Sequence, residues 1–456
     1  MVQVIAMTIK KERLFSNKSL IRLLVPLVIE QGLSILVGMC DSVMVSSAGE
    51  AAISGVSLVD MINAIILTLF AALATGGTVI TSQFLGARKQ ADAQKSAGQL
   101  VFLSAVMGLV CMTLCLVFAR GLMRLFFGSI DADVMEAGLL YLRITAVSFP
   151  FIALYSAGAA IFRSIGNSKI SMQVSILMNV INVVGNAICV LGLKMGVAGV
   201  AIPTLISRAV AAVVILALAS SPKQELQLKK QYVFHIQGKL MRRILHIGIP
   251  SACENSFFQL GRAVVVSMIA LFGTVQTSAN AVAGVLDSLA CIGGNAMSLA
   301  MVTVIGQCIG AGDMKQVTYY IKKMMLWAYI LWALNSVPIL LFCRQLIGFY
   351  STLSPETAEL SFTLVWIHNG IGILLWPASF VLPNALRAAN DVKYTMWVGV
   401  ISMLLARIAL SWVLCVYFEM GAVGVWWAMV VDWVVRISFF LPRVIHGKWK
   451  EKCFLA

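Results

Sequence analysis

Long runs of apolar residues alternate with short polar links along most of the chain. A helix needs about 20 apolar residues to cross the roughly 30 Å hydrocarbon core of a bilayer. Because the runs are continuous, without the residue-by-residue alternation of a β-barrel strand, they indicate helices. The pattern predicts twelve membrane spans, at 21–46, 52–85, 97–119, 138–162, 171–193, 198–220, 246–271, 277–308, 319–343, 358–386, 395–418 and 423–445.

Composition supports an all-α polytopic membrane protein. Hydrophobic residues make up 60% of the 456 residues and charged residues 12%, about half the share usual in soluble domains. The net charge of +15 does not indicate nucleic-acid binding, because 25 of the 34 Lys and Arg fall in the N-terminus, the even-to-odd links and the C-terminus. This asymmetry predicts that both termini are cytoplasmic. The ten scattered Cys are interpreted as small apolar side chains.

The two halves of the chain repeat each other at a constant offset of about 224 positions. The pairs in this register include Pro26 with Pro250, Glu30 with Glu254, Gln83 with Gln307, Gly86 with Gly310 and Arg163 with Arg387. Six spans in each half give both halves the same orientation, related by an axis along the membrane normal. We therefore expect an N-terminal six-helix lobe at 1–221, a cytoplasmic linker at 222–238 and a C-terminal six-helix lobe at 239–456.

Six carboxylates lie within the predicted spans, where an unpaired charge costs about 2.5–3.5 kcal/mol by insertion scales. They are Glu30, Asp41, Asp60, Glu254, Asp287 and Asp432. Glu30 and Asp41 are eleven residues apart, so they share one helix face and are interpreted as parts of an ion path. Pro26, one turn before Glu30, predicts a hinge, and Pro250 predicts its equivalent in the second half.

Other polar residues in the spans are open to two interpretations each. Asn182 and Asn186 share a helix face, where amides bind Na⁺, bond a carboxylate or join helices. Arg262, two turns beyond Glu254, is a candidate partner for that carboxylate. His368 is either a titrating group or a packing residue.

Two further features concern pairs of residues. Asp432 and Arg436, four residues apart, predict a local ion pair. Asp60 and Asp287 fall in the outer third of the second and eighth spans, and we expect both to face the cavity between the two halves.

Motifs for enzymatic chemistry do not occur. The sequence has no phosphate-binding G-x-x-x-x-G-K-[ST], no H-E-x-x-H and no G-x-S-x-G. The chain is therefore predicted not to be an enzyme and to use no cofactor. A transporter of this kind would draw energy from an H⁺ or Na⁺ gradient.

Several motifs together resemble the multidrug and toxic compound extrusion (MATE) family, bacterial type, of the multidrug/oligosaccharidyl-lipid/polysaccharide exporter superfamily. They are LVPLVIEQ and GMCDSVMV in the first span, QFLGARKQADA after the second, FRSIGNSK after the fourth, and N-x-x-x-N followed by GVAGVAIPT. The resemblance covers about 20–445. It implies two six-helix lobes that alternate access in the plasma (inner) membrane. It also implies export of cationic or amphipathic compounds in exchange for H⁺ or Na⁺.

The resemblance also implies roles for individual residues. Asp41 matches the family's acidic residue of the first span, Asn182 the Asn of an N-x-x-x-D pattern, and Thr204 a Thr of the sixth span. Asn186 stands where that pattern has Asp. This difference leaves Asp41 as the main acid, so a weak Na⁺ site at Asp41, Asn182 and Asn186 and a purely proton-coupled site both remain open. Glu254 is a candidate for cavity lining or gating.

Two alternatives compete with the drug antiporter. A flippase of lipid-linked oligosaccharide precursors belongs to the same superfamily. Those proteins tend to have extra spans or a strongly cationic cavity, whereas the spans here contain six acids and five Arg. A membrane receptor or scaffold would need a soluble effector surface, and the longest link, 221–245, is too short to form one. We expect the bilayer and small molecules as partners, no nucleic acid, and function as a monomer.

Overall fold

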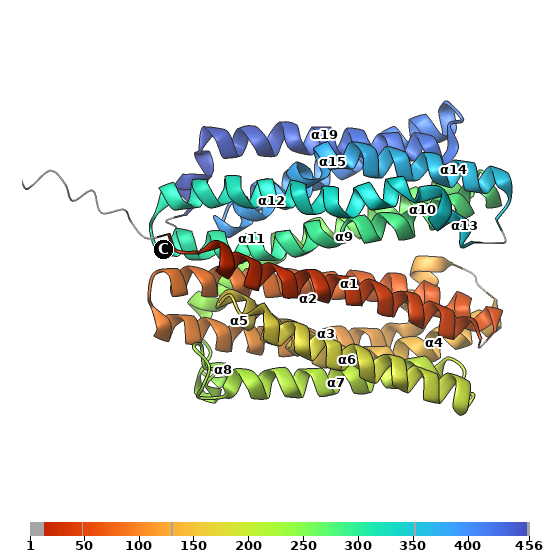
Figure 1. The fold of residues 1–456 in the computed structure, drawn as a ribbon. Helices are drawn as coiled ribbons and strands as arrows, with labels where there is room; N and C mark the ends of the chain where they lie inside the picture. Colours follow the sequence, from red (N-terminus) through yellow and green to blue (C-terminus); the bar gives the residue numbers. More distant parts are fainter. Residues whose placement is uncertain (1–12, 48, 129–130, 351–352, 454–456) are drawn as a thin grey trace, which may run out of the picture.

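The structure is a computed structural model that describes residues 13–47, 49–128, 131–350 and 353–453. All regular elements within these residues are helices. The N-terminal lobe contains α1 (Asn17–Ser46), α2 (Glu50–Gly86), α3 (Gln90–Phe127), α4 (Ala132–Val147), α5 (Phe149–Ser164), α6 (Ser168–Asn186), the π-helix η1 (Ala187–Gly192) and α7 (Ala198–Ser220). It occupies the lower half of Figure 1.

The second lobe follows a short linker that contains α8 (Lys230–Phe234). Its first helices are α9 (Gly238–Ala270), α10 (Thr274–Ala290), α11 (Ile292–Gly310), α12 (Met314–Leu341), α13 (Cys343–Gly348) and α14 (Pro355–Val365). Its last elements are η2 (Trp366–Gly370), α15 (Ile371–Trp376), η3 (Pro377–Val381), α16 (Leu382–Ala388), α17 (Val392–Ser402), η4 (Met403–Ala409), α18 (Leu410–Trp412), η5 (Val413–Tyr417), α19 (Gly421–His446) and the 3₁₀ turn η6 (Lys448–Lys452). The expected linker at 222–238 thus lies between the end of α7 and the start of α9.

The expected twelve spans are accounted for. Within the described residues nine helices are long and apolar enough to cross a membrane, or ten when the bent pair α4 and α5 counts as one. Two further long helices, α9 and α19, run beside them (Figure 1). Each of these two carries an acid and an Arg in its middle, Glu254 with Arg262 and Asp432 with Arg436. They bring the number to twelve.

Several expected spans are interrupted in the structure. The span expected at 138–162 bends by 46° between α4 and α5, where Pro150 stands in the first turn of α5. Proline lacks the N–H that would continue the preceding helix, so it favours this break. The tenth and eleventh spans contain π-helical segments, which are frequent at functional sites. By contrast, α1 continues through Pro26 and α9 through Pro250 as single helices.

Each lobe has its own hydrophobic core. The first half of α1 packs in the core of the C-terminal lobe, and the first half of α9 packs in the core of the N-terminal lobe. Leu20 and Leu23 of α1 pack in the core of the C-terminal lobe. Ile244 and Ile247 of α9 pack in the core of the N-terminal lobe. These two pairs correspond in the register of the repeat, so the internal repeat is also a structural one. The lobes are therefore interlocked at one end of the molecule.

A pair of close backbone contacts joins α2 and α11 at that same end. A Cβ at Gly86 would overlap the carbonyl oxygen of Gln307, and a Cβ at Gly310 would overlap that of Gln83. Only glycine allows this approach. We call these four residues the Gly/Gln clasp.

The side chains of the clasp add hydrogen bonds between the lobes. Gln83 Nε2 donates to the carbonyl oxygen of Ala388 at 2.9 Å, and Gln307 Nε2 donates to that of Ser164 at 2.6 Å. Ser164 and Ala388 also correspond in the register of the repeat. The clasp therefore closes this end with approximate two-fold symmetry.

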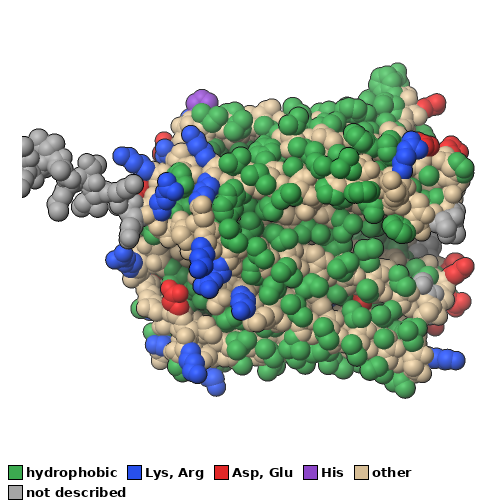
Figure 2. Space-filling view, in the orientation of Figure 1, with side chains coloured by type: hydrophobic (Ala, Val, Ile, Leu, Met, Phe, Trp, Pro, Cys, Tyr) green, Lys and Arg blue, Asp and Glu red, His purple; other side chains and the backbone are tan. Residues whose placement is uncertain are grey.

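Charge distinguishes the two ends of the molecule. Figure 2 shows a broad hydrophobic belt, with most Lys and Arg gathered at the end that carries α8 and Asp and Glu more frequent at the opposite end. An excess of basic residues is typical of cytoplasmic loops. On the expectation from this rule, we name the clasp end the cytoplasmic end and the opposite end the outer end.

Candidate functional site

The N-terminal lobe holds a chain of polar side chains in its outer half. Asn186 Nδ2 donates to Asp41 Oδ1 at 2.7 Å and to Asn182 Oδ1 at 3.3 Å. Asn182 Nδ2 donates to Thr204 Oγ1 at 2.9 Å. The chain joins α1, α6 and α7, because Asp41, the two Asn and Thr204 come from these three helices. The Asp41 carboxylate is thus linked through hydrogen bonds to two neighbouring helices.

A small cavity lies beside this chain. Its volume is about 160 Å³, and Asp41, Asp60, Tyr141, Thr204 and Arg208 are among its lining residues. That is below the roughly 300–1,000 Å³ of pockets for drug-sized ligands. The cavity suits an ion or a few waters.

The oxygens around this cavity are suited to a cation. Asn186 Oδ1 is buried and has no hydrogen-bond partner among the described residues, which leaves a carbonyl-type acceptor beside the Asp41 carboxylate. Among all the residues that the structure describes, no cluster of three or more His, Cys, Asp or Glu is arranged to hold a metal ion. A Na⁺ ion here would be held by Asp41 with amide and hydroxyl oxygens, whereas a proton would bind the Asp41 carboxylate itself.

A larger cavity of about 610 Å³ lies between the lobes. Glu30, Tyr155 and Arg163 line it from the N-terminal lobe. Glu254, Arg387 and Arg436 line it from the C-terminal lobe. The cavity, called the central cavity below, is therefore shared by repeat-related residues of both lobes.

Two repeat-related ion pairs lie in the wall of the central cavity. Glu30 Oε1 lies 3.9 Å from Arg163 Nη1, and Glu30 Oε2 accepts a hydrogen bond from Ser171 Oγ at 3.1 Å. The equivalent Glu254 Oε2 lies 2.7 Å from Arg387 Nη2. All three of Glu30, Glu254 and Arg387 are largely buried. The positive charge of an Arg side chain therefore balances the negative charge of each acid.

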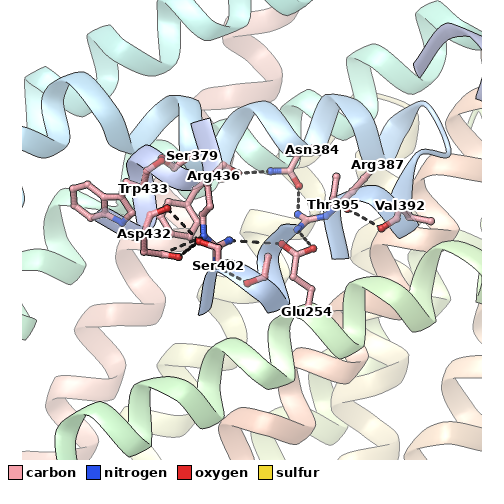
Figure 3. A network of polar contacts seen from close by, with 12 residues as sticks. Glu254, Ser379, Asn384, Arg387, Val392, Thr395, Ser402, Asp432, Trp433 and Arg436 are labelled. Carbon is pink, nitrogen blue, oxygen red and sulfur yellow. Dashed lines mark hydrogen bonds and ion pairs between the residues drawn. The ribbon is translucent and has the colours of Figure 1, made fainter. Parts of the chain in front are cut away.

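The C-terminal lobe extends its ion pair into a network. In Figure 3, Arg436 lies between Asp432 and Glu254, with Nε 3.2 Å from Asp432 Oδ2 and Nη1 3.9 Å from Glu254 Oε1. Ser402 Oγ donates to Asp432 Oδ1, and Arg387 Nη1 donates to Asn384 at 2.8 Å. Each carboxylate in the network has at least one Arg partner within 4 Å.

A third cavity of about 380 Å³ lies in the outer half of the C-terminal lobe. It is lined by charged Arg262, Asp287 and Arg407, by His368, and by Trp376, Trp426 and Trp433. Phe258, Asn295, Trp376 and Phe380 line both this cavity and the central one. The two cavities are therefore adjacent. We call the third one the C-lobe cavity.

Comparison with known proteins identifies the family. The MatE family model matches residues 26–188 and 250–413. The chain belongs to the MatE family. The two matched segments begin at the repeat-related Pro26 and Pro250, so the family unit coincides with the internal repeat. Members of this family are membrane transporters and not enzymes.

Relatives match the MatE chain over nearly its whole length. It is 28% identical to the uncharacterized transporter YisQ of Bacillus subtilis, over 96% of this chain and 95% of that one. It is 26% identical to the probable multidrug resistance protein NorM of Thermotoga maritima, over 96% and 94%. A solved structure described as the outward-facing conformation of a multidrug resistance MATE family transporter superposes with a TM-score of 0.88 at 20% identity, covering 95% and 96%. This structural similarity, at 20% identity, supports the assignment of the overall fold.

Sequence reasoning placed several residues of this MatE chain correctly in space. Asp41, Asn182, Asn186 and Thr204 are brought together, although their role is a separate question. The ion pair between Asp432 and Arg436 is confirmed. The ten Cys, interpreted as small apolar side chains, are free in the structure; Cys115, Cys308, Cys343 and Cys415 are buried, whereas Cys40 and Cys253 are exposed.

Other expectations are corrected by the structure. Arg262 does not pair with Glu254, since Arg387 and Arg436 take that carboxylate and Arg262 lines the C-lobe cavity instead. Glu30 and Asp41 do not line one path along α1, because they belong to two different cavities. The three helical turns between them place one carboxylate at the central cavity and the other nearer the outer end.

Asp60 and Asp287 were expected to face the cavity between the lobes, but neither is among the described lining residues of the central cavity. Asp60 lines the small cavity beside Asp41, whereas Asp287 lines the C-lobe cavity and contacts His368. The sequence did not indicate that Tyr141 and Arg208 belong to a site, although both line the small cavity. Arg208 is recognisable only as an Arg within a span, and its neighbours come from helices distant in the chain.

Proposed function

We propose that this chain is a cation-coupled antiporter, using H⁺ or Na⁺, that exports cationic or amphipathic drugs by alternating access. The coupling site is the Asp41 chain in the N-terminal lobe. Binding a proton or Na⁺ at Asp41 neutralises the carboxylate that accepts from Asn186. Because this bond joins α1 to α6, its change shifts the relative stability of two arrangements of the lobe.

The interlocked cytoplasmic end supports alternating access. The Gly/Gln clasp and the first halves of α1 and α9 hold the two lobes together at the cytoplasmic end. Substrate loading from the cytoplasm requires the clasp to open. Because the clasp is a discrete set of contacts related by approximate symmetry, opening and closing give two distinct states.

The names of relatives favour drug export over the flippase alternative. The Thermotoga maritima relative is named as a probable multidrug resistance protein. The outer residues Asp41 and Asp60 face a cavity too small for a drug, which separates ion binding from substrate binding. Bacterial relatives and the basic cytoplasmic end support a plasma-membrane protein with both termini in the cytoplasm.

The test is gradient-driven transport in proteoliposomes. Purified protein would be reconstituted with a cationic fluorescent substrate, ethidium, or an anionic one, dansylglycine, under an imposed pH gradient or an imposed Na⁺ gradient. We expect one of the gradients to drive transport in the wild type and not in Asp41→Asn. The driving gradient identifies the coupling ion.

A matched control separates coupling from loss of a surface charge. Glu359→Gln removes a carboxylate that lies at the outer surface and pairs with Arg344. It should transport like the wild type. Undiminished gradient-driven transport by Asp41→Asn, at equal reconstituted amounts, would contradict the assignment of the coupling site.

A further inference from the structure

The C-lobe cavity has the size and the position of a substrate subsite. At about 380 Å³ it falls within the range of pockets for small organic ligands. Trp376, Phe258 and Phe380 line both it and the central cavity. These shared side chains place the C-lobe cavity directly beside the central cavity. Among the described residues, the small Asp41 cavity shares no lining residue with either.

Charge in the C-lobe cavity is unbalanced in favour of cationic side chains. Two guanidinium groups, Arg262 and Arg407, face one carboxylate, Asp287, among the described lining residues. Asp287 is in contact with His368. Over the described part of the chain neither Arg has a carboxylate within 4 Å, and Arg407 Nε is buried without a hydrogen-bond acceptor.

Nearby acids outside the lining do not supply the missing partner. Asp432 acts electrostatically on Arg407, but it is bonded to Arg436 and Ser402. A buried guanidinium donor without an acceptor is costly. An anionic ligand would satisfy it, and the planar guanidinium binds a carboxylate through two parallel hydrogen bonds.

Part of the remaining wall of the cavity is aromatic, beside aliphatic residues such as Val265, Val425 and Met429. Trp376 stacks on Trp332 with ring centroids 4.2 Å apart, and His368 lies edge-on to Trp433 at 5.0 Å and to Trp426 at 5.9 Å. Indole faces offer large apolar contact areas with a preferred geometry for another ring. The wall thus favours a flat aromatic ligand.

Among the described residues, each carboxylate that lines the central or the C-lobe cavity already has a basic partner, an Arg for Glu30 and Glu254 and His368 for Asp287. In the central cavity, Glu30 and Glu254 are each within 4 Å of an Arg. We propose that the C-lobe cavity binds the anionic group and the ring of an aromatic amphipathic substrate, with Arg262 and Arg407 holding the anion. This inference rests on the proposed function and, of its two substrate classes, selects amphipathic compounds that carry an aromatic ring and an anionic group.

The test compares two dansyl probes that share one ring system and differ in charge. Dansylglycine carries a carboxylate and dansylcadaverine an ammonium group. Both accept energy from Trp, so binding is read as energy transfer from the protein in nanodiscs of zwitterionic lipid, after subtraction of empty nanodiscs. We expect dansylglycine to bind at least about tenfold more tightly than dansylcadaverine. Equal affinities, or tighter binding of the cation, would overturn the proposal.

Variants locate the binding site. Arg407→Gln should weaken dansylglycine binding about tenfold and leave dansylcadaverine unchanged, and Arg262→Gln should act in the same direction. Arg407→Lys, which keeps the charge, should restore part of the affinity. The control is Arg344→Gln, which removes an exposed guanidinium at the outer surface and should change neither affinity. If the Arg262 and Arg407 variants are folded and bind dansylglycine like the wild type, the anion does not bind here.

This experiment separates the inference from the proposed function. Asp41→Asn should keep the dansylglycine affinity, because Asp41 lies in a different cavity, while losing gradient-driven transport. Loss of coupling together with equal probe affinities in the wild type rejects only the anion site. Selective anion binding together with full transport by Asp41→Asn rejects only the coupling site.

Discussion

The cavities in the outer halves of the two lobes are lined by an opposite excess of charge. In the N-terminal lobe, Asp41 and Asp60 face one Arg, Arg208, around a cavity of about 160 Å³. In the C-terminal lobe, Arg262 and Arg407 face one acid, Asp287, around a cavity of about 380 Å³ with an aromatic wall. The small acidic site suits an ion, and the larger basic one suits an organic anion.

The cytoplasmic halves, in contrast, have kept their symmetry. Glu30 and Arg163 correspond to Glu254 and Arg387, and Gln83 corresponds to Gln307 in the clasp. In the outer half, Asp41 corresponds to Val265 and Asp60 to Gly284. The repeat was therefore retained where the lobes contact each other and was lost where each lobe surrounds its own cavity.

The largest expected effect tests whether coupling belongs to one lobe. Asp41→Asn should lose nearly all gradient-driven transport, whereas Asp287→Asn, the equivalent change in the other outer cavity, should retain most of it. The reason is that Asp41 joins three helices through Asn186, Asn182 and Thr204. Initial rates in proteoliposomes measure the difference. Similar losses in the two variants would mean that coupling is distributed over both lobes.

The second prediction compares the two repeat-related ion pairs. Glu254→Gln leaves Arg387 without its 2.7 Å carboxylate partner, and removing one member of a buried pair costs about 3–5 kcal/mol. Glu30→Gln should cost about 1 kcal/mol, because Arg163 lies 3.9 Å away and Gln still accepts from Ser171. Thermal unfolding of the two variants in detergent gives their order. A Glu30 variant that is the less stable of the two would refute this difference between the lobes.

A third prediction concerns the symmetric part of the molecule. Gly86→Ala places a Cβ against the carbonyl oxygen of Gln307, so the clasp must separate at a cost of about 1–3 kcal/mol. Distances between spin labels at the cytoplasmic ends of α2 and α11 should then shift towards longer values. Gly121→Ala is the control, because none of the described residues lies within 4 Å of its Cβ. An unchanged distance distribution in Gly86→Ala would show that the clasp does not hold the lobes closed.

The smallest expected effect changes the charge of the C-lobe cavity. Asp287→Asn removes the one carboxylate among its described lining residues, so the affinity for dansylglycine should rise about three- to tenfold. Energy transfer in nanodiscs measures it, with Glu359→Gln as the control for removal of an outer carboxylate. A decrease in affinity would indicate that Asp287 helps to position His368 or the Arg side chains for binding.

Much of the fold could be predicted from the sequence, because its main determinant is local. Hydrophobic runs of sufficient length become spanning helices wherever they occur, and the register from Pro26 to Pro250 makes the two lobes equivalent. The breaks were less predictable. Pro150 is visible in the sequence, but whether a proline bends a helix depends on the packing around it, and α1 continues through Pro26.

The sequence by itself determined the spans, the repeat and the identity of the intramembrane charges. Helical spacing also placed Asn182 beside Asn186 and Asp432 beside Arg436. Only the tertiary structure decided which charges meet. Arg387, the partner of Glu254, comes from α16, far along the chain from α9, and its choice depends on how the helices pack. For the same reason Arg262, near Glu254 in sequence, faces a different cavity from the one that Glu254 lines.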